Sequence, residues 1–142
     1  MSVIRIIFPA LILFSLATLL YAGTNFQKII LMNEPSYKHK KKIVQFTHKN
    51  HVSTYQLKCG ECHHDKTGQP VVLKHGTNVD RCITCHSKPG EIKGKKAKGL
   101  SSAEKREYHA NALHDKCRGC HKALKKIDKT RKAPTSCSKC HQ

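Results

Sequence analysis

The feature that most constrains this chain of 142 residues is a five-residue pattern that occurs four times. Two cysteines are separated by two residues, and a histidine follows the second cysteine directly. The four copies contain all eight cysteines of the chain: Cys59-Cys62-His63, Cys82-Cys85-His86, Cys117-Cys120-His121 and Cys137-Cys140-His141. Since histidine makes up only 11 of the 142 residues, chance does not explain a histidine after every pair.

Cys-x-x-Cys-His is the pattern by which c-type haem is attached to protein. The two cysteine sulfurs form thioethers with the porphyrin, and the histidine places an imidazole under the iron. Zinc sites do not need a histidine at a fixed position after every pair, and disulfide frameworks do not space their cysteines so evenly. The sequence therefore predicts four haem c groups, with zinc binding and a disulfide scaffold as alternatives.

The rest of the chain is poor in residues that build a hydrophobic core. Apolar residues make up 38% of the sequence and aromatic residues 6%, and there is no tryptophan. Much of the apolar content lies in the first 23 residues, so the remainder should be marginally stable unless cofactors fill its interior. We expect a small multihaem cytochrome with few short helices, much irregular loop, at most a short two-stranded sheet and a core of haem.

Each iron needs a ligand on its second face, and the histidine count indicates what that ligand is. The two methionines, Met1 and Met32, lie outside the region of the motifs. Seven further histidines remain: His39, His48, His51, His64, His75, His109 and His114. Four of them would complete four bis-histidine irons of low potential, with no open position for O₂ or a substrate.

Closely spaced histidines indicate how the haems are held near one another. His63 and His64 are adjacent, with Cα atoms about 3.8 Å apart, and their side chains leave the backbone in different directions. His63 would bind its own haem while His64 binds a second one. His48 and His51, in the stretch IVQFTHKNH, would likewise offer two imidazoles to two haems, from a helical turn or from an extended segment.

Residues 43–141 resemble the class III cytochromes c, the tetrahaem cytochrome c3 family. The similarity rests on VQFTHKNH, CGECHH, CITCH, EYHANALHDKCRGCH and CSKCH, in this order. Many family members have four residues between the cysteines of the second and fourth motifs, where this chain has two. The resemblance implies four ligand pairs: His63 with His51, His86 with His64, His121 with His48, and His141 with His109. His114 is the alternative to His109, because the stretch between these two is longer than in the family.

Three segments are predicted along the chain. Residues 1–23 are expected to form one hydrophobic helix, as a signal peptide or an uncleaved membrane anchor. Residues 24–42 are predicted to be a lysine-rich linker, and residues 43–142 the haem domain. Ser101 and Glu104 predict a capping box that starts a helix carrying His109, and a further helix is expected over DKCRGCHKALKKI.

The charge of the chain indicates the kind of partner. Lysine and arginine number 27 against 9 acidic residues, a formal net charge of +18, and about eight haem propionates would offset only part of it. A basic surface around a haem edge favours association with an acidic redox protein. Nucleic acid is a poor candidate, because the chain lacks tryptophan and clustered aromatic residues.

The resemblance implies a periplasmic, low-potential electron carrier rather than an enzyme. It would pass electrons between a hydrogenase and membrane redox partners, such as a membrane cytochrome complex, in anaerobic respiration. The alternative is a membrane-anchored tetrahaem quinol dehydrogenase, a class that also has an N-terminal helix and four such motifs. If residues 3–23 are retained, they would anchor the protein to the inner membrane.

Overall fold

The computed structural model describes residues 27–74 and 76–142. The predicted N-terminal signal or anchor helix, residues 1–23, lies outside the described residues, as does His75. Within the described ranges, every helix is too short or too polar to cross a lipid bilayer.

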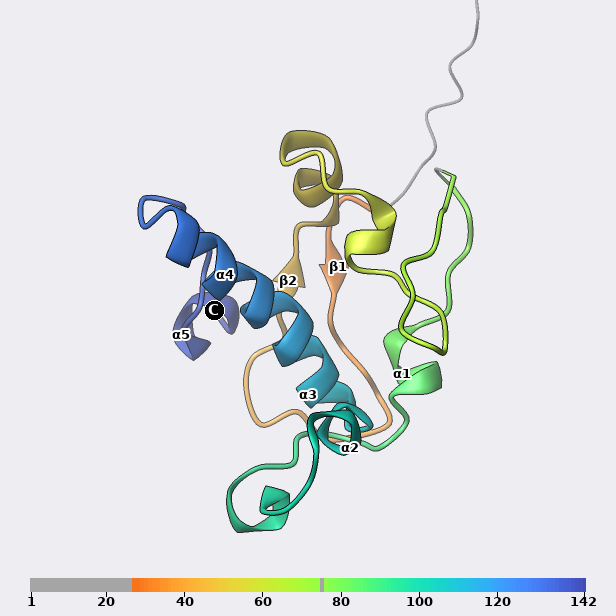
Figure 1. Cartoon of the computed structure of the whole chain (residues 1–142), viewed down its shortest axis with the longest axis vertical. Coiled ribbons are helices and arrows are strands. Elements are labelled where there is room, and N and C mark those ends of the chain that lie inside the picture. Colours follow the sequence, from red (N-terminus) through yellow and green to blue (C-terminus); the bar gives the residue numbers. More distant parts are fainter. Residues whose placement is uncertain (1–26, 75) are drawn as a thin grey trace, which may run out of the picture.

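A helical rod of three consecutive segments crosses the molecule (Figure 1). It consists of α3 (His109–Leu113), the π-helix η4 (His114–Arg118) and α4 (Gly119–Ile127). Alanine, leucine and lysine, all good helix formers, dominate α4. The rod ends where Asp128 turns to an extended conformation. The helix predicted over DKCRGCHKALKKI is therefore confirmed, and it continues without a break from α3.

The other helical segments are single turns or little more. They are η1 (Asn50–Thr54), η2 (Cys59–Glu61), α1 (Cys82–Cys85), η3 (Gly94–Ala97), α2 (Ser102–Arg106) and α5 (Cys137–Cys140). The predicted capping box is confirmed: the backbone N–H of Glu104 donates to Ser101 Oγ, and that of Ser101 donates to the Glu104 carboxylate. The helix that it starts ends at Arg106, so His109 does not lie on α2 but begins α3, after an extended residue, Tyr108.

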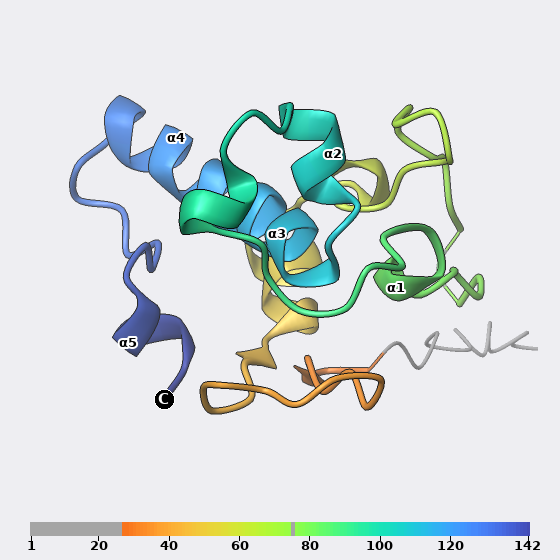
Figure 2. The ribbon, with the colours of Figure 1, turned by 90° about the horizontal axis from the view of Figure 1, so that it is seen from below.

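The small sheet has two strands, β1 (Ile30–Leu31) and β2 (Gln45–Phe46), which pair antiparallel with Ile30 opposite Phe46. The expectation of a short two-stranded sheet is thus confirmed for the described residues. Because β1 lies within residues 24–42, the described part of the expected linker packs against the domain instead of leading freely into it. Figure 2 shows this N-terminal segment along one side of the molecule and α2 on the opposite side, with the helical rod between them.

Side chains provide almost no hydrophobic core in the described part of the chain. Ala112, at 7% exposure, is the one buried apolar residue there, and no described side chain is fully buried. Among the residues described, the buried polar side chains are those of Glu34 and His109. Large apolar residues such as Val72 and Ile127 are exposed. This is the arrangement predicted for a polypeptide whose interior is completed by something other than its own side chains.

Candidate haem-binding sites

Each Cys-x-x-Cys-His motif forms about one helical turn. Cysteines three apart on such a turn lie on the same side of the backbone. In three motifs the backbone N–H of the histidine donates to the carbonyl of the first cysteine, at 2.8 Å for His63 and Cys59, 2.9 Å for His86 and Cys82, and 2.9 Å for His141 and Cys137. The third motif spans the junction of η4 and α4 in the helical rod. All eight cysteines are free thiols, so each pair can form two thioethers.

Eight histidine rings form four close pairs. The distances between ring centroids are 6.5 Å for His48–His63, 6.2 Å for His51–His121, 5.8 Å for His64–His86 and 6.3 Å for His114–His141. A metal ion lies about 2 Å from each coordinating nitrogen, and each nitrogen about 1.1 Å from its ring centroid, so the centroids of two ligating imidazoles should be about 6.2 Å apart. All four pairs lie close to that value, and each contains one motif histidine.

The angles between the paired rings vary from 20° for His51–His121 to 83° for His114–His141. Such variation is compatible with shared metal binding, because each imidazole can rotate about the nitrogen–metal–nitrogen axis without changing the distance. The four centroid separations are therefore compatible with one metal ion between the two rings of each pair.

The adjacent rings of His63 and His64 have different partners. His63 lies beside His48, whereas His64 lies beside His86. The structure thus brings His64 and His86 together as the resemblance implies. For the other sites it brings together different rings from the expected ones.

His48 and His51 are exchanged relative to the expectation. The resemblance implies His63 with His51 and His121 with His48, but His48 lies beside His63 and His51 beside His121. Residues 48–54 are helical, and the Nδ1–H of His51 donates to the carbonyl of Thr47, which fixes its ring within that turn. Which ring meets which motif depends on how this turn is oriented in the molecule, and the spacing of the two histidines carries no information on that.

The fourth site has His114, rather than the expected His109, beside His141. The two candidates are five residues apart on the rod, which corresponds to about 140° around a helix, so they project from different sides. His109 is instead buried at 6% exposure, and its Nδ1 hydrogen-bonds the hydroxyl of Tyr37 at 2.9 Å. Burial lowers the pKa of His109, which favours its neutral form.

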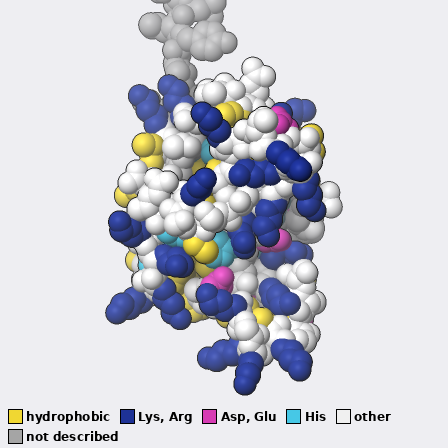
Figure 3. Space-filling view, turned by 90° about the vertical axis from the view of Figure 1, so that its left-hand side faces the viewer, with side chains coloured by type: hydrophobic (Ala, Val, Ile, Leu, Met, Phe, Trp, Pro, Cys, Tyr) yellow, Lys and Arg dark blue, Asp and Glu magenta, His cyan; other side chains and the backbone are white. Residues whose placement is uncertain are grey.

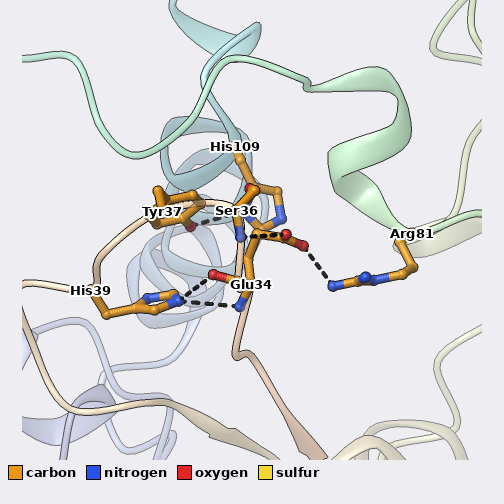
Figure 4. A network of polar contacts seen from close by, with 6 residues as sticks. All are labelled: Glu34, Ser36, Tyr37, His39, Arg81 and His109. Atoms are coloured by element: carbon orange, nitrogen blue, oxygen red, sulfur yellow. Dashed lines mark hydrogen bonds and ion pairs between the residues drawn. The ribbon is translucent and has the colours of Figure 1, made fainter.

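His109 belongs to a polar network that sequence reasoning did not reveal (Figure 4). Its centre is Glu34, at 5% exposure, whose carboxylate accepts from Ser36 N–H at 3.0 Å and forms an ion pair with Arg81. The hydrogen bond from Ser36 and the charge of Arg81 lower the pKa of Glu34. His39 Nε2 lies 2.9 Å from the carbonyl oxygen of Glu34. Nothing in the sequence sets Glu34 apart from the other acidic residues.

Four paired histidines hydrogen-bond a backbone carbonyl through Nδ1. The acceptors are Thr47 for His51 at 2.9 Å, Asp65 for His64 at 2.8 Å, Pro134 for His121 at 2.7 Å and Lys42 for His141 at 2.7 Å. A proton held at Nδ1 leaves Nε2 as the lone-pair nitrogen, the tautomer that a metal-binding histidine needs. These carbonyls therefore hold the four rings in the tautomer that a metal ligand needs.

Two of the sites open to cavities. One, of about 450 Å³, is lined by Lys41, Lys42, Cys137, Ser138 and His141. Another, of about 280 Å³, has both rings of the His64–His86 pair in its wall. Space is thus present beside an attachment motif in the first case and beside a facing imidazole pair in the second.

The cysteines differ from those of a structural zinc site. Cys62, Cys82 and Cys117 are exposed free thiols, each belonging to a pair on its own helical turn. Structural zinc sites hold thiolates in tetrahedral sets of four ligands. Across the described residues, no three His, Cys, Asp or Glu side chains converge on one point where a metal ion could be held. The separate cysteine pairs, each followed by a histidine, fit haem attachment.

A polypeptide that pairs eight imidazoles in this way, and buries so little apolar surface of its own, is built around cofactors: it is a multihaem c-type cytochrome. Comparison with known families gives the same answer, since residues 27–141 match the class III cytochrome c family. The chain belongs to that family, whose members carry covalently bound c-type haem and transfer electrons.

Two relatives bear the name cytochrome c3. The protein from Maridesulfovibrio salexigens is 34% identical over 117 residues, which cover 80% of this chain and 91% of the relative. The protein from Nitratidesulfovibrio vulgaris is 36% identical over 111 residues, which cover 72% of each chain. No solved structure matches the chain.

Proposed function

We propose that the chain binds four haems c, each between two histidines, and acts as a low-potential electron carrier of the periplasm. The observation that carries this proposal is the separation of the four imidazole pairs, between 5.8 and 6.5 Å, with one pair at each attachment motif. A c-type haem supplies reversible one-electron chemistry at its iron, and two imidazole ligands keep its potential low.

The ligands of the four sites follow from the ring pairs. Cys59 and Cys62 would hold the first haem with His63 and His48, and Cys82 and Cys85 the second with His86 and His64. Cys117 and Cys120 would hold the third with His121 and His51, and Cys137 and Cys140 the fourth with His141 and His114. With an imidazole on each face, no iron offers a position to a substrate, which favours a carrier over a quinol dehydrogenase.

Short stretches of backbone link these sites in one order. His63 and His64 are neighbours that serve the first and second sites, and His48 and His51 lie on one helical stretch that serves the first and third. His114 begins η4, which also contains Cys117, so the helical rod joins the fourth site to the third. The sites therefore follow one another in the order second, first, third, fourth, each at a short distance from the next, as electron transfer along the protein requires.

The surface suits an acidic redox partner. Figure 3 shows lysine and arginine side chains spread over one whole face, with few acidic side chains among them. Lys41 and Lys42 line the cavity at the fourth motif. A positive field around a haem site would speed association with an acidic protein, such as a hydrogenase or a membrane cytochrome complex. Such exchange would place the chain in anaerobic respiration.

Three measurements on the holoprotein test the proposal. The mass should exceed that of the polypeptide by four haems, and the pyridine haemochrome spectrum should give the same number. Electron paramagnetic resonance of the oxidised protein should show only low-spin iron, because every iron has two imidazoles. A smaller haem number, or a high-spin signal from the intact protein, would contradict it.

A further inference from the structure

One imidazole of the fourth pair has a carboxylate as its neighbour. His114 Nδ1 lies 3.3 Å from Glu91 Oε1. The other ring of that pair, His141, donates from Nδ1 to the backbone carbonyl of Lys42. His51, His64 and His121 also have backbone carbonyls at Nδ1. His114 therefore differs from these four histidines, because the group beside its Nδ1 is a charged carboxylate and not a neutral carbonyl.

The position of Glu91 is built by hydrogen bonds on both sides of it. Before it, the backbone N–H of Ala110 donates to the carbonyl of Gly90 at 2.9 Å. After it, the Asn111 side chain accepts from the N–H of Ile92 at 2.8 Å and donates to the carbonyl of Ile92 at 3.1 Å. Glu91 is thus held against the first turn of α3, the helix that leads directly into His114.

The backbone conformation of Gly90 also favours the position of Glu91 beside α3. Gly90 has φ at +74°, in the left-handed region that glycine adopts without strain. Two residues earlier, the carbonyl of Lys88 accepts from the N–H of His109 at 2.8 Å. The segment therefore runs beside the start of α3 and turns at Gly90 immediately before Glu91.

The two oxygens of Glu91 have different roles. Oε1 faces His114, whereas Oε2 lies 2.8 Å from Lys93 Nζ. The ion pair with the Lys93 ammonium favours the ionised form of Glu91, so the group beside the imidazole is a carboxylate.

We propose that Glu91 lowers the reduction potential of the fourth haem by accepting a hydrogen bond from His114 Nδ1. This rests on the proposed function, because His114 must be an iron ligand. An anionic acceptor gives the imidazole more negative charge than a neutral carbonyl does, and a more basic imidazole stabilises oxidised iron. Glu91 is thus a positioning and tuning residue that acts through His114 and touches no iron itself.

The test compares the holoprotein with the variant Glu91→Gln, which keeps the size of the side chain and removes its charge. Haem methyl signals followed by NMR during a redox titration give the potential of each haem separately. We expect the oxidised-to-reduced ratio of the fourth haem, at fixed ambient potential, to fall about fivefold, a rise in its potential of about 40 mV for one electron. The largest g value of that haem should also increase, because its axial ligand field weakens.

Asp115→Asn is the matched control. Asp115 follows His114 directly and carries the same charge, but its carboxylate pairs with Arg106 at 3.3 Å. The Asp115→Asn variant measures how far the loss of one negative charge near the fourth site shifts the potential of the fourth haem when the acceptor of His114 is unchanged. The conservative variant Glu91→Asp keeps the charge. Its fourth haem should therefore have a potential between that of Glu91→Gln and that of the unaltered protein.

The outcomes separate this inference from the function on which it rests. If Glu91→Gln has four low-spin haems and shifts the fourth potential no more than Asp115→Asn does, the inference is overturned and the carrier function stands. If the unaltered protein lacks a low-spin fourth haem, or if its fourth iron does not bind His114, the ligand assignment fails first. A shift confined to the fourth haem, with a changed g value, supports the inference.

Discussion

At the scale of single residues, the histidines that the structure describes fall into two groups with different surroundings. Eight lie in pairs at the spacing expected for two imidazoles on one metal. His39 and His109 instead belong to the polar network around Glu34. His109 and His114 belong to different groups although both lie on the helical rod. What separates them is the side of the rod from which each ring projects. Substitution of single histidines should therefore give sharply different results.

Replacement of His114 by alanine should convert the fourth haem to a high-spin, five-coordinate form. The reason is that His141 alone would remain as its axial ligand. Electron paramagnetic resonance of the oxidised protein measures this as a new high-spin signal of one haem in four.

His109→Ala is the control for that variant. It should keep four low-spin haems, but lower the free energy of unfolding by about 1–3 kcal/mol, because a buried hydrogen bond to Tyr37 is lost. If His109→Ala produced the high-spin haem and His114→Ala did not, the pairing implied by family resemblance would be correct and the ring pair in the structure would not be a ligand pair.

His48→Ala and His51→Ala should each remove a ligand from a different haem. The first variant should make the haem on Cys59 and Cys62 high-spin, and the second the haem on Cys117 and Cys120, because of the ring pairs His48–His63 and His51–His121. NMR of the oxidised protein identifies which haem has changed. The opposite result would mean that the helical turn at residues 48–51 is oriented differently in the holoprotein.

At the scale of elements, most helical segments of the described chain are short turns of three to five residues, and these turns position the paired histidines. The π-helical turn of η4 and the single turns of the motifs position paired histidines with very few residues. Such turns are marginal in isolation and depend on their attachments to the rest of the protein. Two glycines inside the attachment motifs show how different these local environments are.

Gly60→Ala should destabilise the protein, whereas Gly119→Ala should not. A Cβ on Gly60 would lie 2.9 Å from the Pro70 side chain and 3.0 Å from the carbonyl oxygen of Val71, so the loop would have to move, at a cost of about 1–3 kcal/mol. A Cβ on Gly119 would meet nothing within 4 Å, and alanine is the better helix former by about 1 kcal/mol. Chemical denaturation of the two holoprotein variants measures both effects, and equal stabilities would contradict the prediction.

At the scale of the whole molecule, the polypeptide lacks the interior that normally stabilises a domain of this size. Ala112 is the single buried apolar residue among those described. The conformational entropy lost on folding is nevertheless as large as for any other chain of this length. The fold is therefore expected to depend on its cofactors. Cavities beside the fourth motif and beside the His64–His86 pair are spaces that such cofactors could enter.

The haem-free polypeptide should be unfolded. Expression without haem attachment, with the cysteines kept reduced, should give a far-ultraviolet circular dichroism spectrum of a disordered chain and no cooperative thermal transition, because too little apolar surface is buried to offset the entropy of folding. The holoprotein under the same conditions is the control. A cooperative transition in the haem-free chain would show that side chains alone suffice for the fold.

The element pattern was largely readable from local sequence. Ser101 with Glu104 predicts the start of α2, and the helix formers after Cys117 predict α4. The packing of residues 27–42 on the domain was not readable, because it depends on contacts of Glu34 and Tyr37 with residues far along the chain. The break between α2 and α3 was not readable either, since the extended residue Tyr108 forms a bridge with Lys88, which is distant in sequence.

The sequence by itself determined the chemistry of the sites. The repeated motif predicts the cofactor, and the surplus of histidine over methionine predicts its second ligand, because both depend only on which residues are present and how closely they follow one another. The tertiary structure alone decided which rings face each other: His48 with His63, His51 with His121 and His114 with His141. Ligands that are distant in sequence meet only through the relative orientation of separate turns, and that orientation is a property of the packed molecule.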